Sequence, residues 1–391
     1  MTETSEKALL PPGLGDVLAP EARIEAETVT RLMAVFESYG YERVKPPLIE
    51  FEENLLAGKG ATIANQTFRL MDPVSQRMLA LRPDMTLQIA RIAETRLGNA
   101  PRPLRLAYAG EVVRIKGSQL RPERQFGQVG VELIGTDVTD ADAETILMAL
   151  EAMEGLGIKN LSVDLGMPSL VQAIMGTALT KEDENTLRQA LDRKDTAAIK
   201  AMSDVLGAGP TKTLLALLGA MGPAKPGLEK MRALNLDGDG GAALLALCDV
   251  VDALLAARPS LVLTVDPVEN RGFEYHTGVS FTFFAKNVRG ELGRGGRYVV
   301  GNGAENGAGN SAGETATGFT LFMDTVLRSL PETQPANRLF LEAGTNTDIA
   351  KKYRAEGWIV ILGMDPSQEA ETEARRLRCS HLLEGGKPRQ L

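Results

Sequence analysis

The sequence has 391 residues, of which 43% are hydrophobic and 24% charged, as expected for a globular chain with more than one domain. A net charge of −8, without a Lys/Arg-rich tract, argues against a large nucleic-acid interface, and two cysteines are too few for a disulfide framework. The polar residues 1–10 and the lack of a run of about 18 apolar residues predict neither a signal peptide nor a membrane span. We therefore expect a cytoplasmic protein.

The first predicted element is an amphipathic helix over Pro20–Tyr39. Pro20 fits the first helical turn, Glu21 suits the positive end of the helix dipole, and Gly40 is a stop signal. Apolar residues at helical spacing predict a buried side, made of Ile24, Leu32, Met33 and Phe36.

An edge segment and a hairpin follow this helix. Tyr41–Phe51 contains two consecutive prolines, which favour an extended segment at the edge of a sheet. The alternating pattern from Leu104 to Ile115, a charged loop over Lys116–Glu123 and a second strand over Gln125–Ile134 predict an antiparallel hairpin.

The second hairpin strand carries polar residues on one face. Gln128, Gly130 and Glu132 point one way, and the residues between them are apolar. A ligand would fit between Gln128 and Glu132, because Gly130 has no side chain. The same alternation is typical of a sheet with one solvated face, so the pattern leaves both interpretations open.

A second polar cluster lies in the segment LRPDMT, which contains Arg82, Asp84 and Thr86. These residues suit a ligand-binding loop. Alternatively, Asp84 caps a helix that carries Leu87 and Ile89, and the pattern alone favours this capping role.

A third cluster, Arg271–His276, places a cation, a carboxylate and aromatic rings at the start of a strand. His276 has the side chain of a general base, but no Ser or Cys nucleophile motif accompanies it. The chain has only two histidines, so we expect no His-based metal site. The glycine-rich stretch Gly293–Tyr298 is suited to approach a ligand, without the context of a P-loop, and residues 301–313 suit a flexible loop.

The order of these patterns predicts three domains. Residues 1–165 and 261–335 form a core domain, 166–260 a mostly helical insertion with a capping Thr180, and 336–391 a short α/β domain. In the second half of the chain we predict strands over Leu261–Val265, Val279–Ala285, Arg338–Leu341 and Trp358–Leu362, and helices over Phe319–Leu330, Asp348–Glu356 and Pro366–Arg378.

Taken in order, the segments resemble histidyl-tRNA synthetase, a class II aminoacyl-tRNA synthetase, over roughly residues 10–330. The resemblance lies in PPGLGDVLAPEA, in YGY followed by Pro47 and Glu50 (the dimer-forming motif 1), and in LRPDMT, RQFGQVGVELIG of motif 2, RGFEYHTG and GGRY. It implies an α+β fold of the class II synthetase type. We expect a mixed, mainly antiparallel sheet flanked by helices, with a helical insertion and a short C-terminal α/β unit.

Two positions depart from the family where it binds ATP. The motif 2 glutamate that binds the adenine amino group is replaced by Lys116, although Arg114 is retained. The motif 3 arginine that grips the ATP phosphates is replaced by Thr325. A lost charged hydrogen bond costs roughly 1.5–3 kcal/mol, so we expect weak productive ATP binding. The C-terminal unit is also shorter than the family's anticodon-binding domain.

The histidine pocket of the family is better retained. The resemblance implies that carboxylates bind the ligand's ammonium group, arginines its carboxylate, and Glu132 and Tyr275 its imidazole. We expect no catalytic residue, metal or cofactor. The implied histidine-binding residues are Asp84, Thr86, Arg114, Gln128, Glu132, Arg271 and Tyr275.

A retained amino-acid pocket beside a dismantled nucleotide site resembles the regulatory subunits of ATP phosphoribosyltransferase, which act in the first step of histidine biosynthesis. This resemblance implies a short-form catalytic subunit as partner, histidine as effector, and a homodimer within a hetero-oligomer that does not bind tRNA. Two alternatives are a divergent synthetase that activates histidine with ATP, and an amino-acid sensor with another partner.

Overall fold

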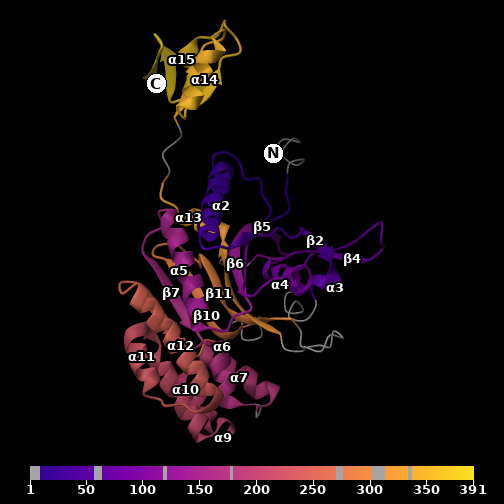
Figure 1. Cartoon of the computed structure of the whole chain (residues 1–391), viewed down its shortest axis with the longest axis vertical. Coiled ribbons are helices and arrows are strands. Elements are labelled where there is room, and N and C mark those ends of the chain that lie inside the picture. Colours follow the sequence, from indigo (N-terminus) through magenta and orange to yellow (C-terminus); the bar gives the residue numbers. More distant parts are fainter. Residues whose placement is uncertain are drawn as a thin grey trace. The chain divides into compact units, whose positions relative to one another are not determined.

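A nine-stranded sheet forms the centre of the larger part of the chain (Figure 1). The computed structural model describes residues 9–56, 64–117, 121–176, 179–269, 276–301, 313–332 and 337–391. The strand order is β1 (Glu42–Arg43), β5 (Leu104–Val113), β6 (Gln125–Ile134), β12 (Glu314–Phe322), β11 (Gly293–Val300), β10 (His276–Ala285), β7 (Leu161–Gly166), β9 (Val262–Asp266) and β8 (Gly222–Pro223).

The pairing of these strands confirms the predicted sheet type. The pairs β1–β5 and β7–β9 are parallel, and the other neighbours are antiparallel. The predicted hairpin is β5–β6, with Leu104 opposite Ile134 and Val113 opposite Gln125.

Helices cover both faces of the sheet. α2 (Glu21–Ser38) and α5 (Thr139–Gly155) share one core with the apolar face of β6, and Leu32, Met33 and Phe36 are buried there as predicted. α4 (Thr86–Thr95) packs in a second core on the other face, with Tyr108 and Tyr298. Both faces of β6 are therefore buried.

The edge segment after α2 contributes to two sheets, which confirms its prediction. β1 is the edge strand of the large sheet, and β2 (Ile49–Phe51) is an edge strand of a small one. The small sheet has the order β2, β4 (Met78–Leu81) and β3 (Arg69–Met71), and α3 (Glu52–Leu55) follows β2 directly.

Seven helices lie between β7 and β9 in the described chain. Thr180 caps α7, as predicted, by accepting a hydrogen bond from the Asp183 backbone N–H at 3.2 Å. These helices belong to the same compact unit as the sheet, residues 1–330, so their separation as a domain of 166–260 remains a prediction. They are α6 (Pro168–Met175), α7 (Lys181–Asp192), α8 (Thr196–Ala201), α9 (Ser203–Leu206), α10 (Ala208–Ala220), α11 (Ala224–Arg232) and α12 (Gly238–Ala257).

Among the described residues, one helix, α12, has the length and apolar composition to cross a membrane. The core helices of soluble proteins pass the same test. Here α12 packs against α5, α6 and α11, and Leu247, Cys248, Val250 and Val251 are buried between them. Its place in the core accounts for part of its apolar composition, since 39% of the apolar stretch is buried.

The second half of the chain differs from its prediction at two places. The glycine-rich stretch Gly293–Tyr298, for which we predicted no secondary structure, belongs to strand β11. The predicted helix Phe319–Leu330 is wrong at its start, because it begins only at Met323, as α13 (Met323–Ser329), after β12. Strand β12 is buried on both faces and lacks the polar alternation by which a strand is recognised, whereas the glycines of β11 weaken its strand pattern. The glycines allow close packing: a Cβ at Gly295 would lie 2.5 Å from the Phe281 ring. Residues 302–312 of the expected flexible loop lie outside the described residues.

The second compact unit, residues 331–391, is a small α/β fold. The predicted strands and helices appear as β13 (Arg338–Leu341), α14 (Thr347–Ala355), β14 (Ile359–Leu362) and α15 (Ala370–Arg376). A hairpin of β15 (His381–Glu384) and β16 (Lys387–Gln390), which we did not predict, completes a sheet of order β14, β13, β15, β16.

Candidate functional site

A cavity of about 640 Å³ lies over the sheet, between its central strands and the loop that precedes α4. Four of the seven predicted ligand residues line it, namely Asp84, Thr86, Arg114 and Glu132. Arg271 and Tyr275 lie outside the described residues. Gln128 does not line the cavity, but its amide contacts Asp84. The structure therefore brings five of the predicted residues together.

The polar face of β6 is buried, so its interpretation as a solvated face is wrong. Gln128 and Glu132 are 0% and 1% exposed. The expectation that Gly130 leaves room for a ligand is also wrong, because the Tyr108 ring fills that space. A Cβ at Gly130 would lie 2.6 Å from Cζ of Tyr108 and 2.2 Å from the carbonyl oxygen of Phe319. Gly130 accommodates a tyrosine of the neighbouring strand.

Two tyrosines donate hydrogen bonds to Glu132. The Tyr298 hydroxyl donates to Oε2 at 2.9 Å, and the Tyr108 hydroxyl donates to Oε1 at 3.2 Å. Burial raises the pKa of Glu132 from 4.5 to about 8, the negative charge of Asp84 also raises it, and hydrogen bonds from Tyr298 and Thr86 act in the opposite direction. Near neutral pH the carboxyl group thus holds a proton, and a cationic group bound beside it would favour the ionised form.

Asp84 both shapes the start of α4 and lines the cavity. Its Oδ1 accepts a hydrogen bond from the Thr86 backbone N–H at 2.9 Å, which is consistent with the capping interpretation. Its Oδ2 accepts from Nε2 of Gln128 at 2.9 Å, and Oε1 of Gln128 accepts from the Met85 backbone N–H at 3.1 Å. Gln128 therefore acts here by orienting the Asp84 carboxylate.

Arg114 places a positive charge on the cavity wall. Its Nε donates to the Pro83 carbonyl oxygen at 3.1 Å, and its guanidinium lies 5.0 Å from the centre of the Phe126 ring. Burial lowers the pKa of Arg114, the Asp84 carboxylate raises it, and nearby Arg294 lowers it. A ligand carboxylate would offset the repulsion between the two guanidinium groups.

Several lining residues were not predicted as ligands, including Asp164, Asp266, Glu269, Ser280, Glu291, Arg294, Tyr298 and Thr320. Most come from β10, β11 and β12, or from the ends of β7 and β9. A row of paired residues crosses the sheet from Gly166 through Ser280, Gly296 and Gly318 to Glu132. The sequence pointed to two of them, Arg294 and Tyr298, through the glycine-rich stretch Gly293–Tyr298, which ends in the GGRY motif.

The two altered nucleotide positions differ in their surroundings. Lys116 is exposed, whereas Thr325 is 1% exposed on α13 and its hydroxyl accepts a hydrogen bond from Arg328 at 3.1 Å. The preceding residue, Asp324, pairs with Arg121 at 2.9 Å. The Asp324 carboxylate also lies 3.6 Å from Nη1 of Arg328, so two arginines offset its charge, while Thr325 itself supplies no cation.

His276 lines the same cavity, with its ring over Gly296, where an added Cβ would lie 2.8 Å from Nδ1. Within the ranges that the structure describes, no group of three or more His, Cys, Asp or Glu residues is placed to hold a metal ion. The described cavity combines carboxyl groups, hydroxyl groups and two arginines, which suits a small zwitterionic ligand.

Comparison with known proteins agrees with this geometry. Residues 13–326 match the family model for histidyl-tRNA synthetase. The chain is 52% identical to the ATP phosphoribosyltransferase regulatory subunit of Paramagnetospirillum magneticum, over 98% of each chain, and 50% identical to that of Rhodospirillum centenum, over 98% of this chain and 96% of the relative. The chain belongs to the ATP phosphoribosyltransferase regulatory subunits, within the histidyl-tRNA synthetase family.

Solved structures support the same fold. A Bacillus halodurans protein described as an ATP phosphoribosyltransferase regulatory subunit/histidyl-tRNA synthetase has a TM-score of 0.80 at 24% identity, and the match covers 94% of this chain and 96% of that one. Histidyl-tRNA synthetase from a Nostoc species has a TM-score of 0.76 at 17% identity, over 96% and 91% of the two chains. The class II synthetase fold predicted from the sequence is confirmed, as is the non-catalytic regulatory role in histidine biosynthesis.

Proposed function

We propose that this chain binds histidine in the described cavity and regulates a separate, short-form ATP phosphoribosyltransferase catalytic subunit with which it assembles. The observation that carries the proposal is that acidic and basic side chains line the same cavity. Asp84 and Glu132 can accept from an ammonium group or an imidazole, and Arg114 can hold a carboxylate. Arg271 and Tyr275 are proposed to complete the site.

The chain is proposed to lack aminoacylation activity and to bind no tRNA. Lys116 and Thr325 supply neither the acceptor nor the cation with which the synthetases hold ATP. We further propose that the protein is cytoplasmic and forms a homodimer within the hetero-oligomer, through the surface around α2 and the segment that follows it.

The alternative is a divergent enzyme that activates histidine with ATP. It is favoured by one observation, the match to histidyl-tRNA synthetase over residues 13–326. The two functions differ in the fate of ATP: the synthetase exchanges pyrophosphate with ATP when histidine is present, whereas a regulatory subunit alters phosphoribosyl transfer by its partner.

Reconstitution tests the proposal directly. The chain is mixed with the short-form catalytic subunit that its own organism encodes, and the mixture is separated by size. The proposal predicts a joint complex whose phosphoribosyl transfer from 5-phosphoribosyl diphosphate to ATP differs from that of the catalytic subunit alone. Separate elution with unchanged transfer would contradict it.

A further inference from the structure

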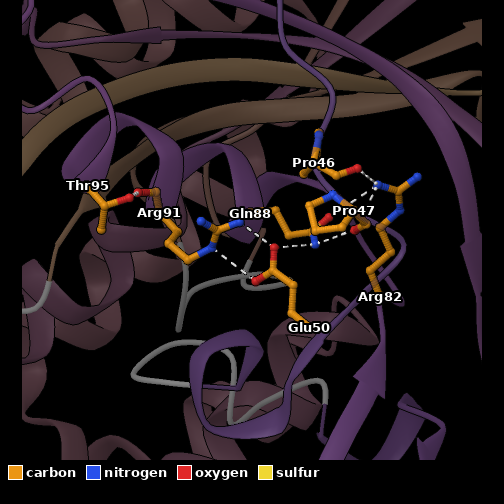
Figure 2. Close-up of polar contacts among 7 residues, drawn as sticks. All are labelled: Pro46, Pro47, Glu50, Arg82, Gln88, Arg91 and Thr95. Atoms are coloured by element: carbon orange, nitrogen blue, oxygen red, sulfur yellow. Dashed lines mark hydrogen bonds and ion pairs between the residues drawn. The ribbon is translucent and has the colours of Figure 1, made fainter.

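A polar cluster outside the cavity joins α4 to β2 and to the extended segment before β2 (Figure 2). Side chains from α4 and from the strand end before it point toward Glu50 and toward two consecutive proline carbonyls. We call it the Glu50 cluster; it consists of Pro46, Pro47, Glu50, Arg82, Gln88, Arg91 and Thr95.

Glu50 is the acceptor at its centre, and its side chain is only 8% exposed. Arg91 grips both carboxylate oxygens, with Nε 3.0 Å from Oε2 and Nη2 bonded to Oε1. Nε2 of Gln88 also donates to Oε1, at 2.8 Å. A forked arginine–carboxylate contact of this kind fixes direction as well as distance, so α4 is held in one orientation against the segment that carries Glu50.

Gln88 and Arg82 extend the cluster to the backbone. Gln88, 1% exposed, donates to the Pro47 carbonyl at 2.8 Å and accepts from Nη1 of Arg82 at 3.3 Å. Arg82, 6% exposed, donates to the Pro46 carbonyl at 3.0 Å and, through Nε, to the Glu111 carbonyl of β5 at 2.7 Å. Arg82 is therefore a structural residue and not a ligand residue of the LRPDMT segment.

Residues of the Glu50 cluster flank the cavity residues Asp84 and Thr86 on both sides in the sequence. Arg82 precedes Asp84 by two positions, and Gln88 follows Thr86 by two. Between these anchors, the loop offers Asp84 and Thr86 to the cavity, whereas Glu50, Gln88 and Arg91 do not line it. Hence any change in the cluster reaches the cavity through the loop from Arg82 to Gln88.

We propose that Glu50, Gln88 and Arg91 are positioning residues of the histidine site, which hold Asp84 and Thr86 at the distance and angle that the ligand requires. The proposal rests on the proposed function for the identity of the ligand. The positioning itself is a property of the free chain, so it is measurable without histidine.

The first test compares Glu50→Gln with a matched control in the free chain. Glutamine keeps the size of the side chain but turns an NH₂ group toward Arg91 or Gln88, which are both donors. The control is Glu144→Gln, because Glu144 is held by both terminal nitrogens of Arg105 on the opposite face, away from the loop. Backbone amide exchange over residues 84–89 should rise at least about threefold in Glu50→Gln and stay unchanged in Glu144→Gln.

The second test measures histidine affinity by calorimetry and combines variants. Glu50→Gln should weaken binding about tenfold, and Glu144→Gln should not. Its effect should be non-additive with Asp84→Asn, which lies on the loop, and additive with Ser280→Ala, which changes a cavity residue on β10. If Glu50 only stabilised the fold, Glu50→Gln would lower the free energy of unfolding, but its effect on histidine affinity would combine in the same way with both second substitutions.

Three results would overturn the positioning role: unchanged exchange over residues 84–89, an equal loss of affinity in both glutamine variants, or additivity of Glu50→Gln with Asp84→Asn. If wild type binds no histidine, the proposed function fails, whereas the exchange experiment still decides whether the cluster holds the loop.

Discussion

The hydroxyl of Tyr298 on β11 reaches across strand β12 to donate a hydrogen bond to Oε2 of Glu132 on β6, over 2.9 Å. The strand between them carries Gly318 opposite Glu132. A Cβ at Gly318 would lie 2.1 Å from Oε2 of Glu132 and 2.3 Å from the Val131 carbonyl oxygen. The missing side chain of Gly318 thus makes room for the Glu132 carboxyl group.

Gly318→Ala should therefore displace the Glu132 carboxyl group and weaken histidine binding by at least about tenfold. Calorimetric titration of histidine measures the effect. Gly219→Ala is the matched control, because that glycine lies in α10 with nothing within 4 Å of an added Cβ. Wild-type affinity in Gly318→Ala would show that the position of Glu132 is irrelevant to the ligand.

The buried carboxyl group of Glu132 should give the free chain a distinctive pH dependence of stability. The folded-state pKa is about 8, against 4.5 for the ordinary side chain. Between these values the folded state keeps a proton that the unfolded state has lost, so the contribution of Glu132 to the free energy of unfolding falls as pH rises toward 8 and is constant above. Glu132→Gln cannot ionise and should lose this slope.

Urea unfolding of wild type and Glu132→Gln from pH 5.5 to 8.5 tests this expectation, with the exposed Glu182→Gln as control. The stability of the Glu132 variant should increase relative to wild type as pH rises, while the difference between Glu182→Gln and wild type stays constant. Parallel pH curves for wild type and Glu132→Gln would mean that the carboxyl group is already ionised in the folded chain.

Histidine activation should be absent. Lys116 and Thr325 replace the ATP contacts of the synthetases, and each lost charged hydrogen bond costs roughly 1.5–3 kcal/mol. Pyrophosphate exchange with histidine and ATP should stay at background, with an active histidyl-tRNA synthetase as positive control. Exchange at about 1 per second or faster would identify an enzyme instead.

The chain should self-associate through the surface around α2 and the segment after it. Apolar side chains stand exposed there, with Leu18 at 71%, Val17 at 57%, and Leu48 and Ile49 each at 40%. A self-complementary twofold interface would cover them. Sedimentation at micromolar concentrations should give a dimer, and a monomer at every concentration would exclude this interface.

The parts of the site that were predictable from the sequence lie within single segments. The alternation of β6 put Gln128 and Glu132 on one face, and the LRPDMT segment placed Asp84 and Thr86 together. Both patterns depend on neighbours along the chain, where strand and helix periods apply. The same short-range periodicity predicted the hairpin β5–β6 and the helix α2.

The other parts of the site depend on how strands that are distant in the sequence pair with one another. The hydrophobic pattern of a single segment does not contain this register. Tyr298 and Gly318 reach Glu132 only because β11 and β12 pair beside β6. Likewise, the Tyr108 ring over Gly130 follows from cross-strand pairing and turns an apparent ligand gap into packed core. Strand β11 was missed because its glycines weaken a strand pattern, and β12 was missed because it is buried on both faces and lacks polar alternation.

The most direct test of the central claim is the inhibition of phosphoribosyl transfer by histidine in the complete complex. Transfer is measured against histidine concentration with wild-type chain, with Glu132→Ala and with the exposed control Lys181→Ala. Loss of the Glu132 acceptor should raise the half-inhibitory concentration about ten- to a hundredfold, and Lys181→Ala should leave it unchanged. Full histidine sensitivity in the Glu132→Ala complex would contradict the account, because histidine would then act outside this cavity.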